Sequence, residues 1–251
     1  MKTQQMVART RVILVIGTMC LALLPSIMSP STMAMAATCA TNDTFNGTGG
    51  SGTPVGAASA SITANAPTFP CSSSQSASLW EMVTGPGSAY AQGGWIIGDG
   101  QPQCTASSPC VWSEYSSATC STCFYPHFYG APSGTHGYET TILSTPQQGT
   151  GFQEDFYKDG ALVDAFSIDW GSFGNGVQFN QENHSDDIHW GTDNFTTARF
   201  CFVPSGYHTC SPTSVFSVTH NLGPTNSYEC FYSTATDAFK DYDTRDNGNH
   251  C

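Results

Sequence analysis

Runs in which small or apolar residues alternate with polar ones constrain this chain most. In Ala58–Ala66 every even position is alanine or isoleucine, and every odd position is serine, threonine or asparagine. Successive side chains of a β-strand point to opposite faces, so this period of two predicts a strand with one buried face and one wet face. Antiparallel sheets commonly expose one face to water in this way.

Similar runs follow along the chain, and they predict an all-β fold. They are Ser78–Val83, Ala89–Ile97, Val111–Tyr115, Tyr138–Ser144, Gly151–Tyr157, Leu162–Ile168 and Val177–Glu182, with shorter pieces at Val215–Val218 and Tyr228–Tyr232. Asp159-Gly160 is typical of a two-residue hairpin turn. A period of 3.6 residues is almost absent, and 25 Gly and 14 Pro interrupt the chain. We therefore expect an antiparallel β-sandwich or barrel and exclude a helical bundle.

The start of the chain predicts a signal peptide over residues 1–36. Lys2, Arg9 and Arg11 form a basic region, Val12–Leu24 is apolar, and Ala34-Met35-Ala36 has the small residues of a cleavage site. The apolar stretch is shorter than the roughly 20 residues that span a bilayer. We therefore expect a secreted, extracellular protein that is not held in a membrane after cleavage.

Composition divides the remaining chain into three segments. Residues 37–57 are rich in Gly, Ser and Thr and are expected to form a flexible lead-in or an edge element. The β-sandwich domain is expected over residues 58–232, and residues 233–251 are expected to form a polar C-terminal tail. All 19 Asp and Glu lie beyond residue 36, so the chain without its signal is strongly acidic and an unsuitable partner for nucleic acid.

Cysteines predict disulfides. Ten remain after the signal: Cys39, Cys71, Cys104, Cys110, Cys120, Cys123, Cys201, Cys210, Cys230 and Cys251. An even number in an exported chain favours disulfide bonds over metal binding or catalysis. Closeness in the chain suggests the pairs 104–110, 120–123 and 201–210, which leaves 39–71 and 230–251. Sequence alone does not fix this pairing.

Three of the expected strands offer polar or aromatic side chains on one face. The sets that share a face are Gln178, Asn180, Glu182 and His184; Trp112 and Glu114; and Tyr90 and Gln92. These faces are either the walls of a cleft or the ordinary solvated faces of an antiparallel sheet.

Five segments between about residues 58 and 183 resemble the eqolisin-type glutamic endopeptidases. The segments are Ser61–Pro67, similar to a strand ending in Ala-Asn-Val-Pro; Trp80 in Ser78–Gly85, similar to Trp-Val-Gly-Ile-Asp-Gly; Gln92 followed by Gly93-Gly94; Trp112-Ser113-Glu114, similar to Trp-Tyr-Glu; and Gln178–Asn183, similar to Glu-aromatic-Ile-Ile/Val-Glu-Asp. The resemblance implies a sandwich of the concanavalin type, a lectin-like jelly roll. It also implies a catalytic pair, Gln92 and Glu182, and a polypeptide substrate bound by Trp80, Trp112 and Glu114.

The chain departs from the family pattern near these residues. Thr84 stands at the position of a family aspartate, and Gln178 replaces the first acidic residue of the last motif. Asn180 and Gln181 replace two aliphatic residues, which makes the surroundings of Glu182 more polar. The segment after Asn183 has no recognised counterpart.

Two other functions remain open from the sequence. In the first, Glu114 and Glu182 are the acid and nucleophile of a glycosidase, and Trp80, Trp95 and Trp112 stack on sugar rings. In the second, the sandwich is not catalytic and binds a glycan or a peptide.

No cofactor or metal is expected. The polar residues Glu182, His184, Asp186, Asp187 and His189 fit neither an EF-hand nor an HExxH helix, so a solvated loop is expected there. The protein is expected to act as a monomer.

Overall fold

A computed structural model describes thirteen ranges and single positions of the chain. These are residues 44–69, 76–98, 104–105, 108–120, 122–130, 132, 134–145, 151–184, 188, 191–202, 209–212, 229–235 and 237–243. They contain strands, turns and bends and no helix. None of these residues therefore forms a helix long and apolar enough to cross a membrane. The predicted signal peptide, Cys39, Cys71, Cys251 and Val215–Val218 lie outside the described residues.

Thirteen strands form from the described residues. They are β1 (Thr44–Thr63), β2 (Ser76–Thr84), β3 (Tyr90–Gly98), β4 (Cys110–Ser116), β5 (Phe124–Tyr129), β6 (Thr135–Thr145), β7 (Gly151–Lys158), β8 (Ala161–Ile168), β9 (Gly174–Asn183), β10 (Asp193–Phe202), β11 (Thr209–Pro212), β12 (Glu229–Ala235) and β13 (Ala238–Asp243). Every pairing between them is antiparallel. The predicted all-β antiparallel fold is confirmed.

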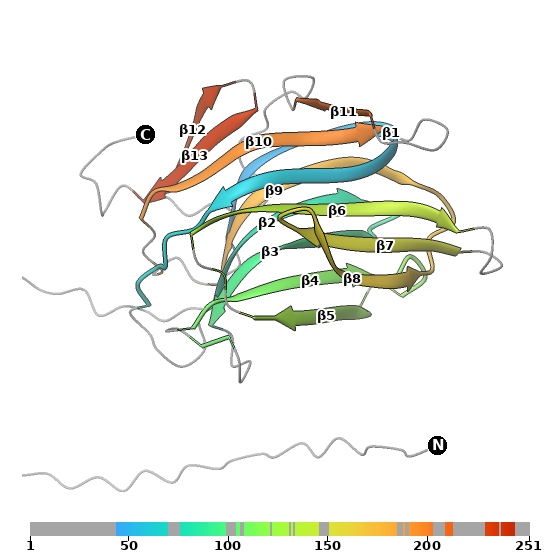
Figure 1. The fold of residues 1–251 in the computed structure, drawn as a ribbon, viewed down its shortest axis with the longest axis horizontal. Coiled ribbons are helices and arrows are strands. Elements are labelled where there is room, and N and C mark those ends of the chain that lie inside the picture. The colour runs from blue at the N-terminus through green and yellow to red at the C-terminus, as the bar shows by residue number, and fades with distance from the viewer. Residues whose placement is uncertain are drawn as a thin grey trace, which may run out of the picture. The chain divides into compact units, whose positions relative to one another are not determined.

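The long strand β1 joins two layers of the sandwich. Its first part, Thr44–Val55, pairs with β9, and the hydrogen-bonded order then runs β9-β2-β3-β4-β5. Its second part, Val55–Thr63, lies between β10 and β6, and the order continues through β7 to β8. Figure 1 shows β6, β7 and β8 in front of the layer that contains β2, β3 and β4. We call the layer β1-β9-β2-β3-β4-β5 the first sheet.

Residues of periodic runs form strands where the sequence predicts them. Each of the seven runs from Ser78–Val83 to Val177–Glu182 falls within β2, β3, β4, β6, β7, β8 or β9, apart from Ala89 directly before β3. The hairpin between β7 and β8 turns at Asp159 and Gly160, whose φ angles are 52° and 77°. Positive φ at both central residues is the backbone of a type I′ turn, which Asp-Gly favours.

The prediction of a flexible lead-in over residues 37–57 is wrong from Thr44 onward, because Thr44–Ala57 belongs to β1. The glycines of this segment allow close strand packing. A side chain at Gly47 would overlap the carbonyl oxygen of Phe179 on β9, so this position requires glycine. Composition alone cannot distinguish glycine in a linker from glycine at a close approach.

The predicted boundary of a polar tail at residue 233 is also wrong. Strand β12 extends to Ala235, and Ala238–Asp243 forms β13, which pairs with β12 and β10. Phe239 anchors this hairpin, since its ring stacks on Phe195 of β10 with centroids 4.4 Å apart. A buried aromatic ring and the pairing with β10 thus attach this polar segment to the core.

Two predicted disulfides are present. Cys104 bonds to Cys110, and Cys120 bonds to Cys123. Cys201 and Cys230 each also take part in a disulfide bond. In the pairing of β10 with β11, Cys201 lies opposite Cys210, its predicted partner. The remaining predicted pairs involve residues outside those that the structure describes.

The core between the layers holds apolar residues from both. Phe156 of β7 packs under β3, where a side chain at Gly93 would overlap its ring. Tyr138 of β6 stacks on Phe156 with ring centroids 6.2 Å apart. Trp95 of β3 and Phe179 of β9 belong to the same cluster. The inward side chains of the first sheet are therefore fixed against the opposite layer.

Two carboxyl groups also lie in this core. Glu81 of β2 and Glu154 of β7 are both 0% exposed. Thr140 Oγ1 donates to Glu81 Oε1 at 2.8 Å, but Glu81 Oε2 and both oxygens of Glu154 have no hydrogen-bond partner. Burial raises the pKa of both groups well above the ordinary value, and each has further acidic neighbours: Glu139 raises the pKa of Glu81, and Glu81, Asp164, Glu114 and Asp155 raise that of Glu154.

This pair predicts a protein that is most stable in acid. The folded state keeps the protons of Glu81 and Glu154 to higher pH than the unfolded state, whose glutamates ionise at about pH 4.3. The free energy of unfolding should fall above that pH, by up to about 1.4 kcal/mol per pH unit for each group, until the folded group ionises. In Glu154→Gln this slope should be smaller, as measured by urea unfolding from pH 3 to 8.

The matched control is Asp237→Asn, in the turn between β12 and β13, which should keep the wild-type slope because Asp237 is not among the acidic neighbours that raise the pKa of Glu81 or Glu154. A wild-type stability that rises from pH 4 to pH 7 would contradict the assignment of two buried, protonated carboxyls.

Candidate active site

The face of the first sheet that points away from the core carries the predicted site residues, and we call it the open face. Antiparallel register places its side chains in cross-strand rows. The rows read Glu182, Ser78 and Ile96; Asn180, Trp80, Gly94, Trp112 and Phe128; Gln178, Met82, Gln92, Glu114 and Pro126; and Gly176, Thr84, Tyr90, Ser116 and Phe124. All five predicted site residues therefore lie on one face.

A cavity of about 270 Å³ opens on this face, and Gln92 and Glu182 both line it. Its lining residues are Phe45, Trp80, Met82, Tyr90, Gln92, Gln178, Asn180 and Glu182. Trp112 and Glu114 lie beside the cavity, not in its lining. A second hollow, of about 330 Å³, lies on the outer face of the other layer near Ser59, Tyr157 and Thr197 and holds none of the predicted site residues.

Glu182 is held in place by donors from β2. Trp80 Nε1 donates to Glu182 Oε2 at 3.0 Å, and Ser78 Oγ donates to the same oxygen at 3.4 Å. Hydrogen bonds from neutral donors to a carboxylate are stronger than those between neutral groups. Both contacts use one oxygen, which fixes the direction of the carboxyl group along the cavity wall.

Gln92 is oriented from the other side, by β4. Its Nε2 donates to Glu114 Oε1 at 3.5 Å, and Tyr90 OH donates to the same oxygen at 2.5 Å. Burial raises the pKa of Glu114, and the hydrogen bonds from Tyr90 and Gln92 act in the opposite direction. Burial and the nearby charge of Glu114 also raise the pKa of Tyr90. In this structure Glu114 contacts the amide of Gln92.

Trp80 and Trp112 belong to a second apolar cluster, on the open face. The cluster also contains Met82, Ile96 and the disulfide Cys104–Cys110, with Phe45, Tyr90 and Phe128 packed against it. Trp95, which the glycosidase hypothesis places on a sugar ring, faces the core and is 4% exposed. That part of the hypothesis is wrong, because Trp95 lies one residue out of phase with Gly94 and Ile96 of the open face.

Several cavity residues were not among the predicted site residues. The period of two in the sequences of β9 and β3 places Gln178, Asn180 and Tyr90 on this face, so these three could have been predicted as site residues. The sequence gives no such indication for Phe45, because it lies in the segment predicted to be a flexible lead-in. In β1 it pairs with Glu182 and so reaches the cavity.

Asn180 is an unusual member of this set. Its side chain is 0% exposed, and neither Oδ1 nor Nδ2 has a hydrogen-bond partner. Leaving such a group unpaired in the interior is destabilising. Buried polar groups without partners are uncommon in folded proteins and are often found at functional sites.

The described residues contain no group of three or more His, Cys, Asp or Glu that could hold a metal ion. Asp186, Asp187 and His189 lie outside those residues.

Solved structures of other proteins have a similar fold to this chain. A scytalido-glutamic peptidase bound to a peptide-based transition state analog matches with a TM-score of 0.51 and 13% identity, over 80% of this chain and 98% of that chain. Another structure, of scytalido-glutamic peptidase with a transition state analog inhibitor, matches with a TM-score of 0.50 and 10% identity, over the same shares. This chain has the fold of the glutamic peptidases. No family model matches the sequence, and the search of curated proteins gives no match.

The unpaired amide of Asn180 gives a prediction about stability. Leucine has a similar shape and no polar atoms, so Asn180→Leu should raise the free energy of unfolding by about 1–3 kcal/mol. Urea unfolding at pH 4 measures the change.

The control is the same substitution at Asn175 of β9, whose amide donates to the Gly85 carbonyl at 2.9 Å and accepts from Thr84 Oγ1 at 2.8 Å. Asn175→Leu should lower stability. If Asn180→Leu also lowers it, the amide is satisfied in the folded protein and the assignment is wrong.

Proposed function

We propose that the chain is a secreted endopeptidase of the glutamic type, which hydrolyses peptide bonds in acid. The observation that carries the proposal is that Gln92 and Glu182, from strands that are not neighbours, line one cavity. The shared fold supports it, because the sequence resemblance had matched these two residues to the family's catalytic positions. The polypeptide substrate follows from the same resemblance.

The proposed reaction uses Glu182 as general base and then general acid. Its carboxylate accepts a proton from a water molecule while the water oxygen bonds to the peptide carbonyl carbon. The resulting carboxylic acid returns the proton to the peptide nitrogen as the C–N bond breaks. Trp80 holds one carboxyl oxygen by its N–H, which fixes the direction of the carboxyl group in the cavity.

Gln92 is proposed to orient that water and to stabilise the oxyanion. One N–H of its amide points to Glu114, which leaves its carbonyl oxygen and its second N–H for the cavity. The carbonyl oxygen accepts from the water, and the N–H donates to the negative oxygen that develops in the transition state. Glu114 then acts through Gln92, as a positioning residue.

An acidic working range fits the chemistry and the core. An ordinary glutamate has a pKa of about 4.3, so it is a poor base at neutral pH and well matched to acid. The core carboxyls Glu81 and Glu154 stay protonated there. Few Lys and Arg are present, seven in the whole chain, so protonation of the carboxylates leaves only modest positive charge to repel itself.

The direct test is release of peptides from an acid-denatured protein, scanned from about pH 2 to 8 around the glutamate pKa. Wild type should be active in acid. Glu182→Gln keeps the shape but removes the base, and we expect a loss of about 100-fold or more in kcat. Glu139→Gln, a carboxyl on the other layer, should keep wild-type activity.

A folded wild-type protein with no peptide release would contradict the proposal, and so would full activity in Glu182→Gln. If sugars were released instead and both Glu114→Gln and Glu182→Gln abolished the release, a glycosidase would be established. Glycan binding without hydrolysis would establish a lectin-like protein.

A further inference from the structure

Strand β5 extends the open face beyond the cavity. Its even positions, Phe124, Pro126 and Phe128, pair with Ser116, Glu114 and Trp112 of β4 and therefore lie on the open face. Its odd positions face the other way. No strand among the described residues pairs with the free edge of β5, which lies at one end of the first sheet (Figure 1).

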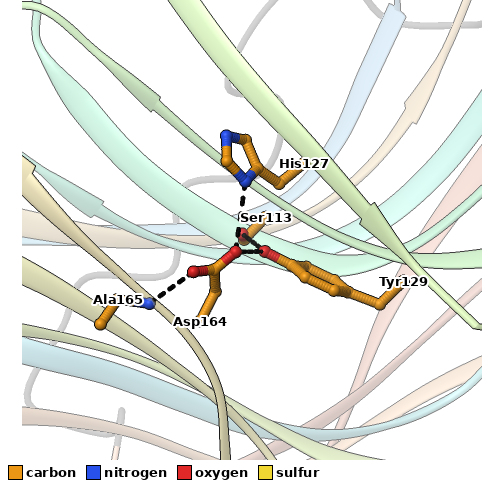
Figure 2. Close-up of polar contacts among 5 residues, drawn as sticks. All are labelled: Ser113, His127, Tyr129, Asp164 and Ala165. Carbon is orange, nitrogen blue, oxygen red and sulfur yellow. Dashed lines mark hydrogen bonds and ion pairs between the residues drawn. The ribbon is translucent and has the colours of Figure 1, made fainter.

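The odd positions fix β5 to the opposite layer. Tyr129 OH donates to Asp164 Oδ2 of β8, and His127 Nδ1 lies 3.2 Å from the same oxygen (Figure 2). Ser113 Oγ of β4 lies 3.2 Å from Tyr129 OH. The backbone N–H of Ala165 donates to Asp164 Oδ1 at 2.7 Å, which orients the carboxylate. These contacts hold β5 against the opposite layer, so the side chains that β5 carries on the open face lie in defined positions.

Phe124 connects this strand to the cavity. Its side chain is 49% exposed although it is a large apolar residue. Its ring stacks on Tyr90 with centroids 6.1 Å apart and an interplanar angle of 26°. Tyr90 itself lines the cavity that holds Gln92 and Glu182. The two rings form a continuous apolar surface that begins in the cavity and ends at the edge of the sheet.

We infer that Phe124 and Tyr90 form a subsite for a large apolar side chain of a polypeptide substrate. The inference rests on the proposed peptidase function and adds a specificity to it. Covering solvent-exposed aromatic surface with an apolar group lowers the free energy of the complex, because apolar area is removed from water. A rigid aromatic ring also loses little conformational entropy on binding. A polypeptide is the occupant that reaches both the reacting groups and the edge strand.

Sheet geometry fixes which substrate residue meets this surface. Phe124 is two strands and two residues away from Gln92 in the register of β3, β4 and β5. With strands about 4.8 Å apart and a rise of about 3.4 Å per residue, the two Cα atoms are about 12 Å apart. An extended peptide covers that distance in three to four residues. The preferred side chain should therefore be three or four residues from the cleaved bond.

The test compares two peptides that differ only at that position, one with Phe and one with Ala. Wild type should cleave the Phe peptide with a kcat/KM about tenfold higher. Phe124→Ala should reduce this ratio to about one, and Phe124→Leu should keep most of it. The matched control is Tyr125→Ala, because Tyr125 is 43% exposed and lies on the opposite face of the same strand. Circular dichroism confirms that each variant is folded.

The outcomes separate the subsite from the proposed activity. If wild type cleaves neither peptide, the proposed function fails, and the affinities of the same peptides are then compared by calorimetry. A preference that depends on Phe124 and not on Tyr125 supports the subsite in either assay. An equal ratio in wild type and Phe124→Ala overturns it. So does a dimer that dissociates in Phe124→Ala without a change in the ratio, because the surface would then serve a second copy.

Discussion

The antiparallel register of β9, β2, β3 and β4 is the constraint on which the site depends. It places Leu79 and Phe179 in the core and leaves Trp80 and Glu182 on the open face. A slip by one residue would exchange the two sets. The opposite layer prevents such a slip, because Thr140 bonds to Glu81 and Phe156 packs where Gly93 leaves room. Core packing thus determines which side chains line the cavity.

Both faces of this sheet carry buried polar groups, and both suit an acidic medium. In the core, Glu81 and Glu154 are accommodated as neutral acids. On the open face, Trp80 and Ser78 donate to Glu182, and Gln92 donates to Glu114, which also accepts from Tyr90. The core is most stable below about pH 4.3, where Glu81 and Glu154 are protonated, whereas a general base must be ionised, which an ordinary glutamate is above that pH. Fold stability therefore requires protonated carboxyls and the proposed chemistry an ionised one, and mild acid near the ordinary glutamate pKa serves both.

Alternation predicted much of the fold and the face on which the site lies. A period of two assigns Gln92, Glu114 and Glu182 to faces, and the sequence resemblance ordered their strands, so their common face was foreseeable. Pairing between distant segments was not. Nothing local in Gly47 or Phe45 shows that β1 pairs with β9. Hydrogen-bond partners such as Tyr90 for Glu114 depend on rotamers and burial that periodicity does not contain.

The proposed mechanism requires Gln92 and Glu182 to act on the same atoms. A crystal structure with a non-cleavable peptide analogue, grown in acid, tests this most directly. We predict that the tetrahedral group of the analogue lies in the cavity beside Trp80. One of its oxygens should be within hydrogen-bond distance of the Gln92 amide and another within that distance of Glu182. An analogue bound elsewhere, or one that contacts only one of the two residues, would contradict the account.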